Sequence, residues 1–213
     1  MANVIKLTFN PFQENTYLVY DDTKECVILD PGCYHAHEKE ELVNTIERLQ
    51  LQPVRLVNTH CHVDHVFGNK FVAETYQLQL ECHEGEVPVL QAVPQVCMMY
   101  GIPYPDVSPI PGAYLKEGEK LTFGNTEMDI FFTPGHSPAS LCFYDKVSGF
   151  VIGGDVLFRD SIGRTDLPGG DHATLLKSIE TQLFTLPDAT EVYPGHGPKT
   201  TVGYEKVNNP FMR

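Results

Sequence analysis

Apolar and polar positions along the chain predict strands interspersed with helices. Short apolar runs that contain β-branched or aromatic residues and have the length of buried strands occur at 26–29, 53–58, 128–132, 150–152 and 191–193. Two segments instead show helical spacing, the amphipathic stretch 37–50 and the stretch 67–77, where Phe67, Phe71 and Tyr76 recur about every four residues. The residues between 53–58 and 67–77 therefore form a loop from a strand to a helix.

Four of these runs end in the same way. Each stops at a loop or a Gly or Pro turn, and a histidine or aspartate follows just beyond its carboxyl end. Open α/β sheets usually place their functional sites at this end of the strands. The residues in question are His60 after 53–58, His136 in TPGHS, Asp155 in FVIGGDVLF and His196 in YPGHG.

The first of these loops, NTHCHVDH, is the densest in candidate ligands. It contains His60, His62 and His65, three of the nine histidines of the chain, together with Asp64. In an extended chain, side chains two positions apart point to the same side, so His60 and His62 can bind one ion while Cys61 points away. Asp64 and His65 follow a bend and point elsewhere. Imidazole and carboxylate groups are ligands for Zn, Fe and Mn, and two differently directed pairs predict two metals.

A single loop cannot complete two coordination shells, so the hypothesis requires further ligands. His136, Asp155 and His196 supply them, which gives seven candidate metal ligands: His60, His62, Asp64, His65, His136, Asp155 and His196. Taken singly, a histidine after a Pro-Gly turn is more often a loop residue, and a lone aspartate is more often a cap or turn former. The cluster in the first loop raises the expectation for the other three, because a dinuclear site needs them.

The other histidines have structural interpretations. His35 and His37 precede or begin the amphipathic segment 37–50 and are expected to face solvent, with an accessory metal pair as the alternative. His172 follows Asp171, a predicted helix cap, and His83 ends a short apolar run.

Taken together, THCHVDH, TPGHS, GGDVLF and PGHG resemble the metallo-β-lactamase superfamily over nearly the whole chain. GRTDLPGGD at 163–171 and the terminal PGHGPKTTVGYEKVNNPF resemble its short hydroxyacylglutathione hydrolase (glyoxalase II-like) branch. The resemblance implies an α/β fold, the four-layer αββα sandwich, with the site along one sheet edge. It also implies one metal held by His60, His62 and His136, a second by Asp64, His65 and His196, and Asp155 bridging them.

Composition is compatible with this hypothesis. At 213 residues and 42% hydrophobic content the chain can form one sizeable core, and without an evident linker or repeat we expect one domain, 1–213. The net charge of −13 argues against a broad nucleic-acid surface, and hence against the RNA-processing nucleases with the same signature. No signal peptide or long apolar run is evident, which predicts a cytoplasmic protein with no membrane partner. The six cysteines lack CxxC spacing and are expected to be reduced.

The chemistry predicted for this site is hydrolysis. Two divalent metals, with Zn expected and Fe or Mn as alternatives, would share a water, lower its pKa towards neutrality and provide a hydroxide nucleophile, with Asp64 and Asp155 as the carboxylates at the reaction centre. A small acyl thioester suits the site, because a thiolate leaves without a dedicated general acid. S-lactoylglutathione-like substrates follow from the resemblance. The chain stops about where the helical domain of full-length glyoxalase II would begin, so we expect weak dependence on glutathione itself.

Three interpretations of function remain open at this stage. They are the dinuclear thioesterase, a mononuclear iron persulfide dioxygenase with a similar GRTD stretch, and a non-catalytic metal-binding or redox partner. For the thioesterase we expect Arg164 to meet a substrate carboxylate, with a surface or loop-pinning role as the alternative. The proline-rich segment 85–115 is expected to form a pocket wall or lid with Met99 and Tyr100, or else to fill the core. The sequence does not decide the oligomeric state, for which a monomer is the starting expectation.

Asp30, which ends the apolar run CVIL, is expected to support the histidine loop without binding metal. The alternative is that it simply forms a turn before Pro31 and Gly32.

Overall fold

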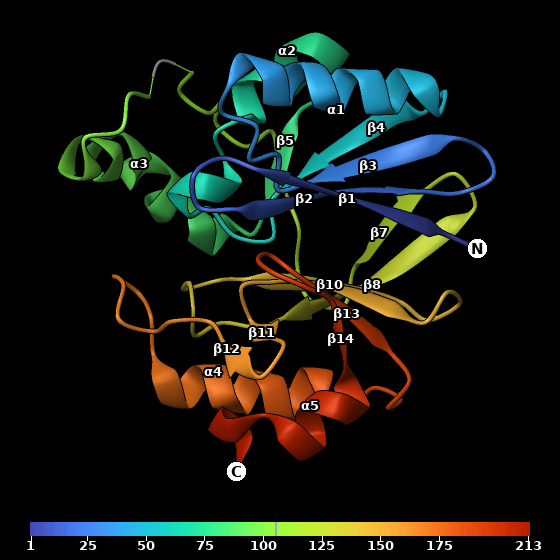
Figure 1. Cartoon of the computed structure of the whole chain (residues 1–213), viewed down its shortest axis with the longest axis vertical. Helices are drawn as coiled ribbons and strands as arrows, with labels where there is room; N and C mark the ends of the chain where they lie inside the picture. Colours follow the sequence, from blue (N-terminus) through green and yellow to red (C-terminus); the bar gives the residue numbers. More distant parts are fainter. Residues whose placement is uncertain (105) are drawn as a thin grey trace.

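Four layers, helix, sheet, sheet and helix, make up the fold (Figure 1). The structure, a computed structural model, describes residues 1–104 and 106–213; Pro105 of the proline-rich segment lies outside the described residues. The first sheet has the order β1-β2-β3-β4-β5-β6 and the second the order β14-β13-β10-β9-β8-β7. The predicted αββα sandwich is therefore confirmed.

The first sheet and its helices occupy the amino-terminal half. Its strands are β1 (Asn3–Phe9), β2 (Glu14–Tyr20), β3 (Glu25–Leu29), β4 (Gln52–Val57), β5 (Leu80–Cys82) and β6 (Ala113–Tyr114). Helices α1 (Ala36–Arg48) and α2 (Asn69–Tyr76) cover its outer face in Figure 1. Both were predicted, from 37–50 and 67–77, because their apolar residues recur at helical spacing. A short 3-10 turn, η1 (Val63–His65), lies between β4 and α2.

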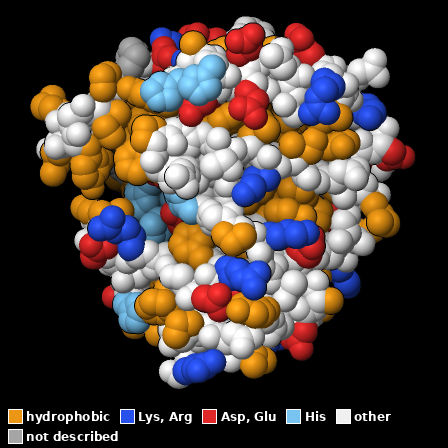
Figure 2. Space-filling view, viewed as in Figure 1, with side chains coloured by type: hydrophobic (Ala, Val, Ile, Leu, Met, Phe, Trp, Pro, Cys, Tyr) orange, Lys and Arg blue, Asp and Glu red, His pale blue; other side chains and the backbone are white. Residues whose placement is uncertain are grey.

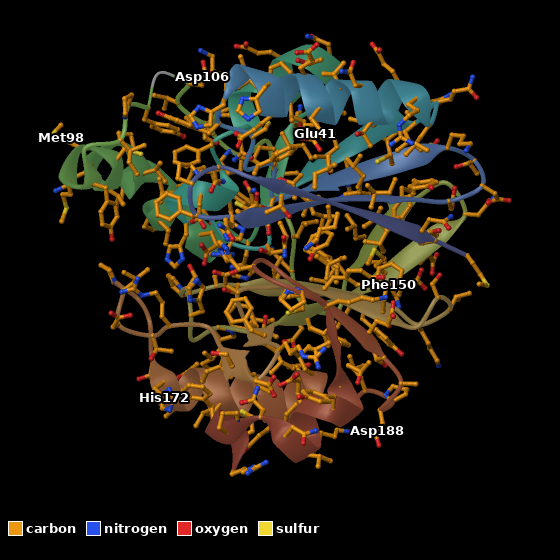
Figure 3. All side chains as sticks on the ribbon, viewed as in Figure 1. Glu41, Met98, Asp106, Phe150, His172 and Asp188 are labelled. Carbon is orange, nitrogen blue, oxygen red and sulfur yellow. The ribbon has the colours of Figure 1, made fainter. Side chains whose placement is uncertain are left out.

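The second sheet and its helices follow in the chain. Its strands are β7 (Lys120–Phe123), β8 (Thr126–Phe132), β9 (Leu141–Asp145), β10 (Phe150–Gly154), β13 (Glu191–Pro194) and β14 (Thr200–Thr201). Strands β11 (Leu157–Phe158) and β12 (Ser161–Ile162) form a separate hairpin. The outer face of the second sheet carries α4 (His172–Ser178), the π-helical η3 (Ile179–Leu183), α5 (Val202–Asn208) and η4 (Pro210–Met212). In Figure 3, His172 and Asp188 lie in this outer layer, far from Met98 at the other end of the molecule.

Successive residues of the central strands alternate between two cores. In β2, Tyr17 and Val19 belong to the core between the sheets, whereas Leu18 belongs to the core beneath the helices of the first sheet. In β10, Ile152 faces the inter-sheet core and Val151 the core beneath α4. Side chains alternate along a strand, so a sheet covered on both faces needs apolar residues at every position. This requirement explains why the runs 26–29 and 150–152 are apolar at every position and the other runs at most positions.

The proline-rich segment 85–115 forms more regular structure than its composition suggests. It contains the short turn η2 (Glu84–Glu86) and the helix α3 (Val87–Tyr100), which projects at one edge of the first sheet (Figure 1). Pro88 lies in the first turn, where the amide hydrogen that it lacks would have no helical partner. Within the described residues, no helix combines the length and the apolar character that crossing a bilayer requires.

The loop after β13 is attached to the first sheet. Asn15 N donates to Gly195 O at 2.7 Å, and its side-chain amide donates to Pro194 O at 3.0 Å. The Tyr17 hydroxyl donates to the same Pro194 carbonyl at 2.6 Å. The loop that contains His196 is thus held by both sheets.

Candidate metal centre

The carboxyl ends of four strands meet at one edge of the sandwich. Strand β8 runs antiparallel to β9, and β9 antiparallel to β10, so β8, β10 and the parallel β13 all point the same way. The loops after these strands and after β4 bring the seven predicted side chains together from positions as far apart as His60 and His196. The common ending of the four runs in the sequence is therefore a common location in space.

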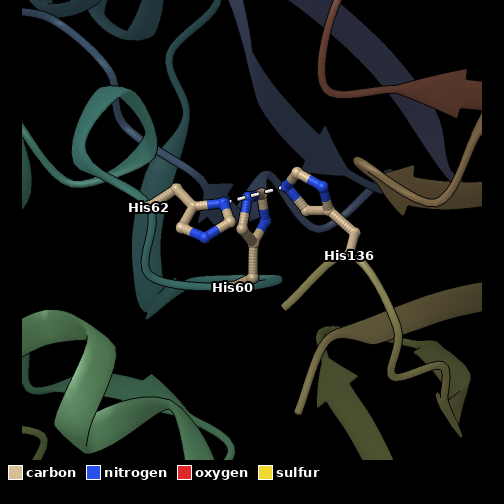
Figure 4. A group of neighbouring side chains, drawn as sticks. All are labelled: His60, His62 and His136. Carbon is tan, nitrogen blue, oxygen red and sulfur yellow. Dashed lines mark hydrogen bonds between the residues drawn. The ribbon is translucent and has the colours of Figure 1, made fainter. Parts of the chain in front are cut away.

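His60, His62 and His136 form one group at this edge (Figure 4). Each offers a ring nitrogen, and these nitrogens lie within 4.8 Å of one another. His62 Nδ1 and His136 Nε2 are 2.8 Å apart. Two imidazole nitrogens at this distance can share one proton, or a cation can take the place of that proton between them.

Asp64, His65 and His196 form a second group, with ligand atoms again within 4.8 Å of one another. His196 Nε2 lies 3.1 Å from Asp64 Oδ2, and His65 Nε2 lies 3.7 Å from the same oxygen. Asp64 and His65 belong to the turn η1, whereas His60 and His62 precede it, as predicted from the bend in this loop.

Asp155 lies between the two groups. Its Oδ2 is 3.5 Å from His136 Nε2 in the first group and 3.5 Å from His196 Nε2 in the second, and its Oδ1 is 3.5 Å from His65 Nε2. Burial disfavours ionisation of Asp155, but the charges of His65 and then of His136 outweigh it and hold the pKa of Asp155 well below its usual range. The side chain is thus an anion that contacts both groups.

Asp30 orients two of the histidines from behind, as predicted. It is buried, and its carboxylate accepts hydrogen bonds from Thr59 N at 2.7 Å and from the Thr59 hydroxyl at 2.6 Å. The single hydroxyl proton of Thr59 goes to Asp30, so Thr59 Oγ1 accepts from His60 Nδ1 at 3.0 Å. His65 Nδ1 lies 3.2 Å from Asp30 Oδ2. In both histidines Nδ1 is the donor, so Nε2 faces the cluster and is the atom that can bind a metal ion in its unprotonated form.

Backbone carbonyls orient two more histidines. His136 Nδ1 donates to the carbonyl of Arg164 at 2.7 Å, and His196 Nδ1 donates to that of Phe12 at 3.1 Å. A carbonyl oxygen can only accept, so Nδ1 carries a proton in each ring, and Nε2 is the atom directed towards the cluster. Burial, followed by the charge of His136, lowers the pKa of His62 to about 3, which keeps the His62 imidazole neutral.

Several buried polar atoms in the cluster have no hydrogen-bond partner. They include His60 Nε2, His65 Nε2 and Asp155 Oδ1. Buried polar atoms in proteins are nearly always paired, so three unpaired atoms in one cluster indicate a bound group that would satisfy them. Imidazole lone pairs and carboxylate oxygens are suitable ligands for Zn, Fe or Mn. The residues present fit divalent metal ions.

The close packing around the cluster explains the glycine of the PGHG motif. A Cβ on Gly195 would collide with Asp155 Oδ1 and would lie 2.8 Å from His65 Cε1. Only glycine lets the loop after β13 pass this close to the two side chains.

Glu86 is a residue of the site that sequence reasoning missed. It is fully buried at the start of α3, and its carboxylate accepts from Cys61 N at 2.9 Å, from the Ser137 hydroxyl at 2.7 Å and from Ala139 N at 2.8 Å. Cys61 lies between His60 and His62, and Ser137 follows His136. One carboxylate therefore fixes both loops of the first group relative to each other.

Replacing Glu86 by Gln is expected to weaken metal binding to the first group by roughly 10- to 100-fold, the usual effect of losing a group that supports ligands from behind. The amides of Cys61 and Ala139 donate to different oxygens of Glu86, and a glutamine places an NH2 donor against one of them. Metal titration of the purified variant, followed calorimetrically, measures the change. Glu84→Gln, the same substitution at an exposed position two residues away, is the matched control. Equal affinities in Glu86→Gln and wild type would contradict this role.

A cavity of about 790 Å³ opens onto the cluster and is lined by His62, Asp64, His136, Asp155 and His196. Met99 and Tyr100, the predicted substrate contacts, lie in its wall, as does Arg164. The Arg164 guanidinium forms two hydrogen bonds to Asp166, at 2.7 and 2.8 Å, and both side chains are exposed. Arg164 therefore lines the cavity and is also held in its loop, so the structure contains elements of both alternatives.

The remaining histidines lie outside the cluster. His35 and His37 are exposed and stacked, with ring centroids 5.5 Å apart. His83 accepts from Gly85 N, and Asp171 caps α4 by accepting from Thr174 N, as predicted. All six cysteines are free and buried, and Cys61 packs in the core beneath the helices of the first sheet.

Comparisons with known proteins agree with this geometry. A sequence model of the Metallo-beta-lactamase superfamily matches residues 9–196. A protein of Bacillus subtilis named "Probable metallo-hydrolase YqgX" is 38% identical over 210 residues, which cover 97% of this chain and 96% of the relative. The "Hydroxyacylglutathione hydrolase GloC" of Haemophilus influenzae is 35% identical over 211 residues, which cover 99% and 98%. The solved structure of TTHA1623 in a di-iron-bound form has a TM-score of 0.88 and 38% identity, over 98% of this chain and all of that one.

Proposed function

Because the chain belongs to the metallo-β-lactamase superfamily, we propose that it is a dinuclear hydrolase of small acyl thioesters such as S-lactoylglutathione. The relatives described above carry the names of a metallo-hydrolase and of a hydroxyacylglutathione hydrolase. The position of Asp155 carries the proposal. Its carboxylate lies 3.5 Å from a histidine of each group, which is the arrangement that a shared ligand of two metals requires. The name of the GloC relative supports the thioester substrate.

In this proposal the seven side chains would hold two metal ions. His60, His62 and His136 would hold the first, Asp64, His65 and His196 would hold the second, and Asp155 would contribute to both sites. When bound, such ions supply Lewis acidity for a carbonyl oxygen and lower the pKa of water towards neutrality. Zn is the expected metal, and Fe or Mn are alternatives. The di-iron-bound structure of the similar protein TTHA1623 supports iron as one of these alternatives.

The chain's own residues hold the cluster and the substrate. Asp30, directly and through Thr59, and the carbonyls of Arg164 and Phe12 hold four imidazoles with Nε2 towards the cluster. Asp64 and Asp155 line that cavity and can accept a proton from water at the reacting carbon. The thiolate of a thioester leaves near neutral pH without a protonated side chain, so the site needs no separate general acid.

Metal content and hydrolysis, measured on one preparation, test the proposal. The protein is stripped with a chelator, reloaded with Zn²⁺, Fe²⁺ or Mn²⁺, and assayed with S-lactoylglutathione and other acyl thioesters. We expect about two ions per chain and hydrolysis that follows reloading. Protein that carries two ions and cleaves no thioester would refute the substrate class. One iron per chain with oxygen consumption on a persulfide would establish the dioxygenase instead, and neither activity would favour a non-catalytic partner.

A further inference from the structure

The walls of the cavity differ sharply from its floor. The floor consists of the histidines and aspartates of the cluster. One wall is α3, with Val89, Ala92, Val96 and Met99, and Phe12 and Phe158 also line the cavity. Figure 2 shows histidine side chains in a hollow below an apolar surface, at the place that α3 occupies in Figure 1.

Helix α3 has two apolar faces. Leu90, Val93 and Cys97 are buried in the core beneath the first sheet. Val89, Ala92, Val96 and Met99 follow one another at three- or four-residue spacing and so share a second face, which lines the cavity. Of these, Ala92 and Met99 are exposed. Val89 and Val96 also pack against the core, but Ala92 and Met99 do not belong to it, and exposed apolar surface beside a reaction centre is typical of a binding surface.

Charge is confined to one side of the cavity mouth. Among the described residues that line the cavity, Arg164 is the one charged side chain beyond the cluster, and Asp166 pairs with it. Apart from the Tyr100 hydroxyl at the end of the helix, the α3 wall thus offers no partner for a charged or strongly polar group. A polar group placed against it would lose hydrogen bonds to water without replacement.

The cavity is large for the smallest substrates. Its volume of about 790 Å³ lies within the range of sites that enclose drug-sized ligands, roughly 300–1,000 Å³. A lactoyl group bound at the cluster would leave most of the α3 wall in contact with water. A longer apolar group would cover that wall and gain the free energy of its burial.

We infer that the preferred substrates are thioesters whose acyl group is a hydrocarbon chain of medium length, and that this chain lies along α3. The inference rests on the proposed thioester hydrolysis. Thiols that carry acyl groups in cells are polar and mostly anionic. In the bound substrate the thiol part therefore extends out of the cavity beside Arg164, and the acyl chain lies against the apolar wall. In the reaction the C–S bond breaks, a C–O bond forms to the oxygen of water, and the products are a carboxylate and a thiol.

A substrate series with one constant thiol tests this assignment. Acetyl, butyryl, hexanoyl and octanoyl thioesters of glutathione are compared with S-lactoylglutathione, on metal-loaded protein and below the concentrations at which the long chains form micelles. We expect kcat/KM to rise by about fourfold for each added methylene that the wall covers. Lactoylglutathione should be a poorer substrate than the butyryl compound.

A pair of variants locates the acyl chain. Ala92→Phe adds a ring on the face of α3 that lines the cavity and is expected to lower the ratio of octanoyl to acetyl kcat/KM by at least about tenfold. Gln95→Phe adds the same ring on an exposed part of the same helix outside the cavity lining and should leave that ratio unchanged.

The possible outcomes separate the inference from the proposed function. A flat chain-length series, a preference for lactoyl over butyryl, or the same change in both variants would overturn the inference while thioester hydrolysis stands. The last of these would point to a docking role for the exposed face of α3. Absence of hydrolysis for every thioester in the series, with two metals bound, would overturn the proposed function itself.

Discussion

Replacing Asp155 by Asn is expected to reduce thioester hydrolysis by more than about 100-fold. Removing a residue that only supports a metal ligand typically costs up to about 100-fold in activity, and Asp155 is itself a proposed ligand. The variant keeps the shape of the side chain and removes its charge. His65, His136 and His196 then lose the anion that lies 3.5 Å from each of them and that belongs to both groups. Steady-state kinetics with matched metal analysis measures the effect.

The matched control is Asp188→Asn. Asp188 is an exposed carboxylate in the outer layer beyond the second sheet, paired with Lys206 at 2.7 Å. Removal of one surface ion pair changes stability little, so this control should keep wild-type activity. Circular dichroism of both variants establishes that they are folded. A folded Asp155→Asn protein with wild-type kcat/KM would remove Asp155 from the reaction.

Replacing His196 by Ala is expected to release one metal ion per chain while the other remains. His196 contacts Asp64 and Asp155, whereas His60, His62 and His136 do not depend on it. Affinity for the second ion should fall by more than about 100-fold, because a direct ligand contributes more than a group behind it. Elemental analysis after dialysis gives the stoichiometry.

His172→Ala serves as the control, because His172 is exposed at the start of α4 and lies outside the cluster. Two ions should remain bound to that variant. Loss of both ions from His196→Ala, or a wild-type stoichiometry of one, would falsify the assignment of the ligands to two groups.

The four layers were expected from the resemblance of the motifs to the metallo-β-lactamase superfamily, whereas the location of the site was predictable from a local pattern. Apolar runs indicate strands, and the turn after each run places its histidine or aspartate at the same edge. Asp30 was identifiable for the same reason, since it ends β3 beside the loop that follows β4. These inferences require only the direction of each strand and the residue that follows it.

Glu86 was not predictable, because its role depends on three-dimensional contacts that leave no local signal. Glu84, two residues earlier, has the same side chain and is exposed, whereas Glu86 is buried among donors from two distant loops. Helix α3 was hidden by its prolines, although Pro88 occupies a first turn in which proline is well tolerated. The pairing of Arg164 with Asp166 was equally hidden, because GRTD gives the neighbours in sequence but not the direction of the guanidinium.

The attachment of the His196 loop to both sheets has a consequence for the motions of the molecule. Asn15 and Tyr17 of β2 are bonded to Pro194 and Gly195, so the loop cannot swing outwards unless the seam between the sheets separates. Fluctuations that disturb the reaction centre from this side are then sub-global openings, which are rare, and not the frequent fraying of a surface loop. The amide of Asn15, which donates to Gly195, should accordingly exchange its hydrogen with solvent about as slowly as the amides of the central strands.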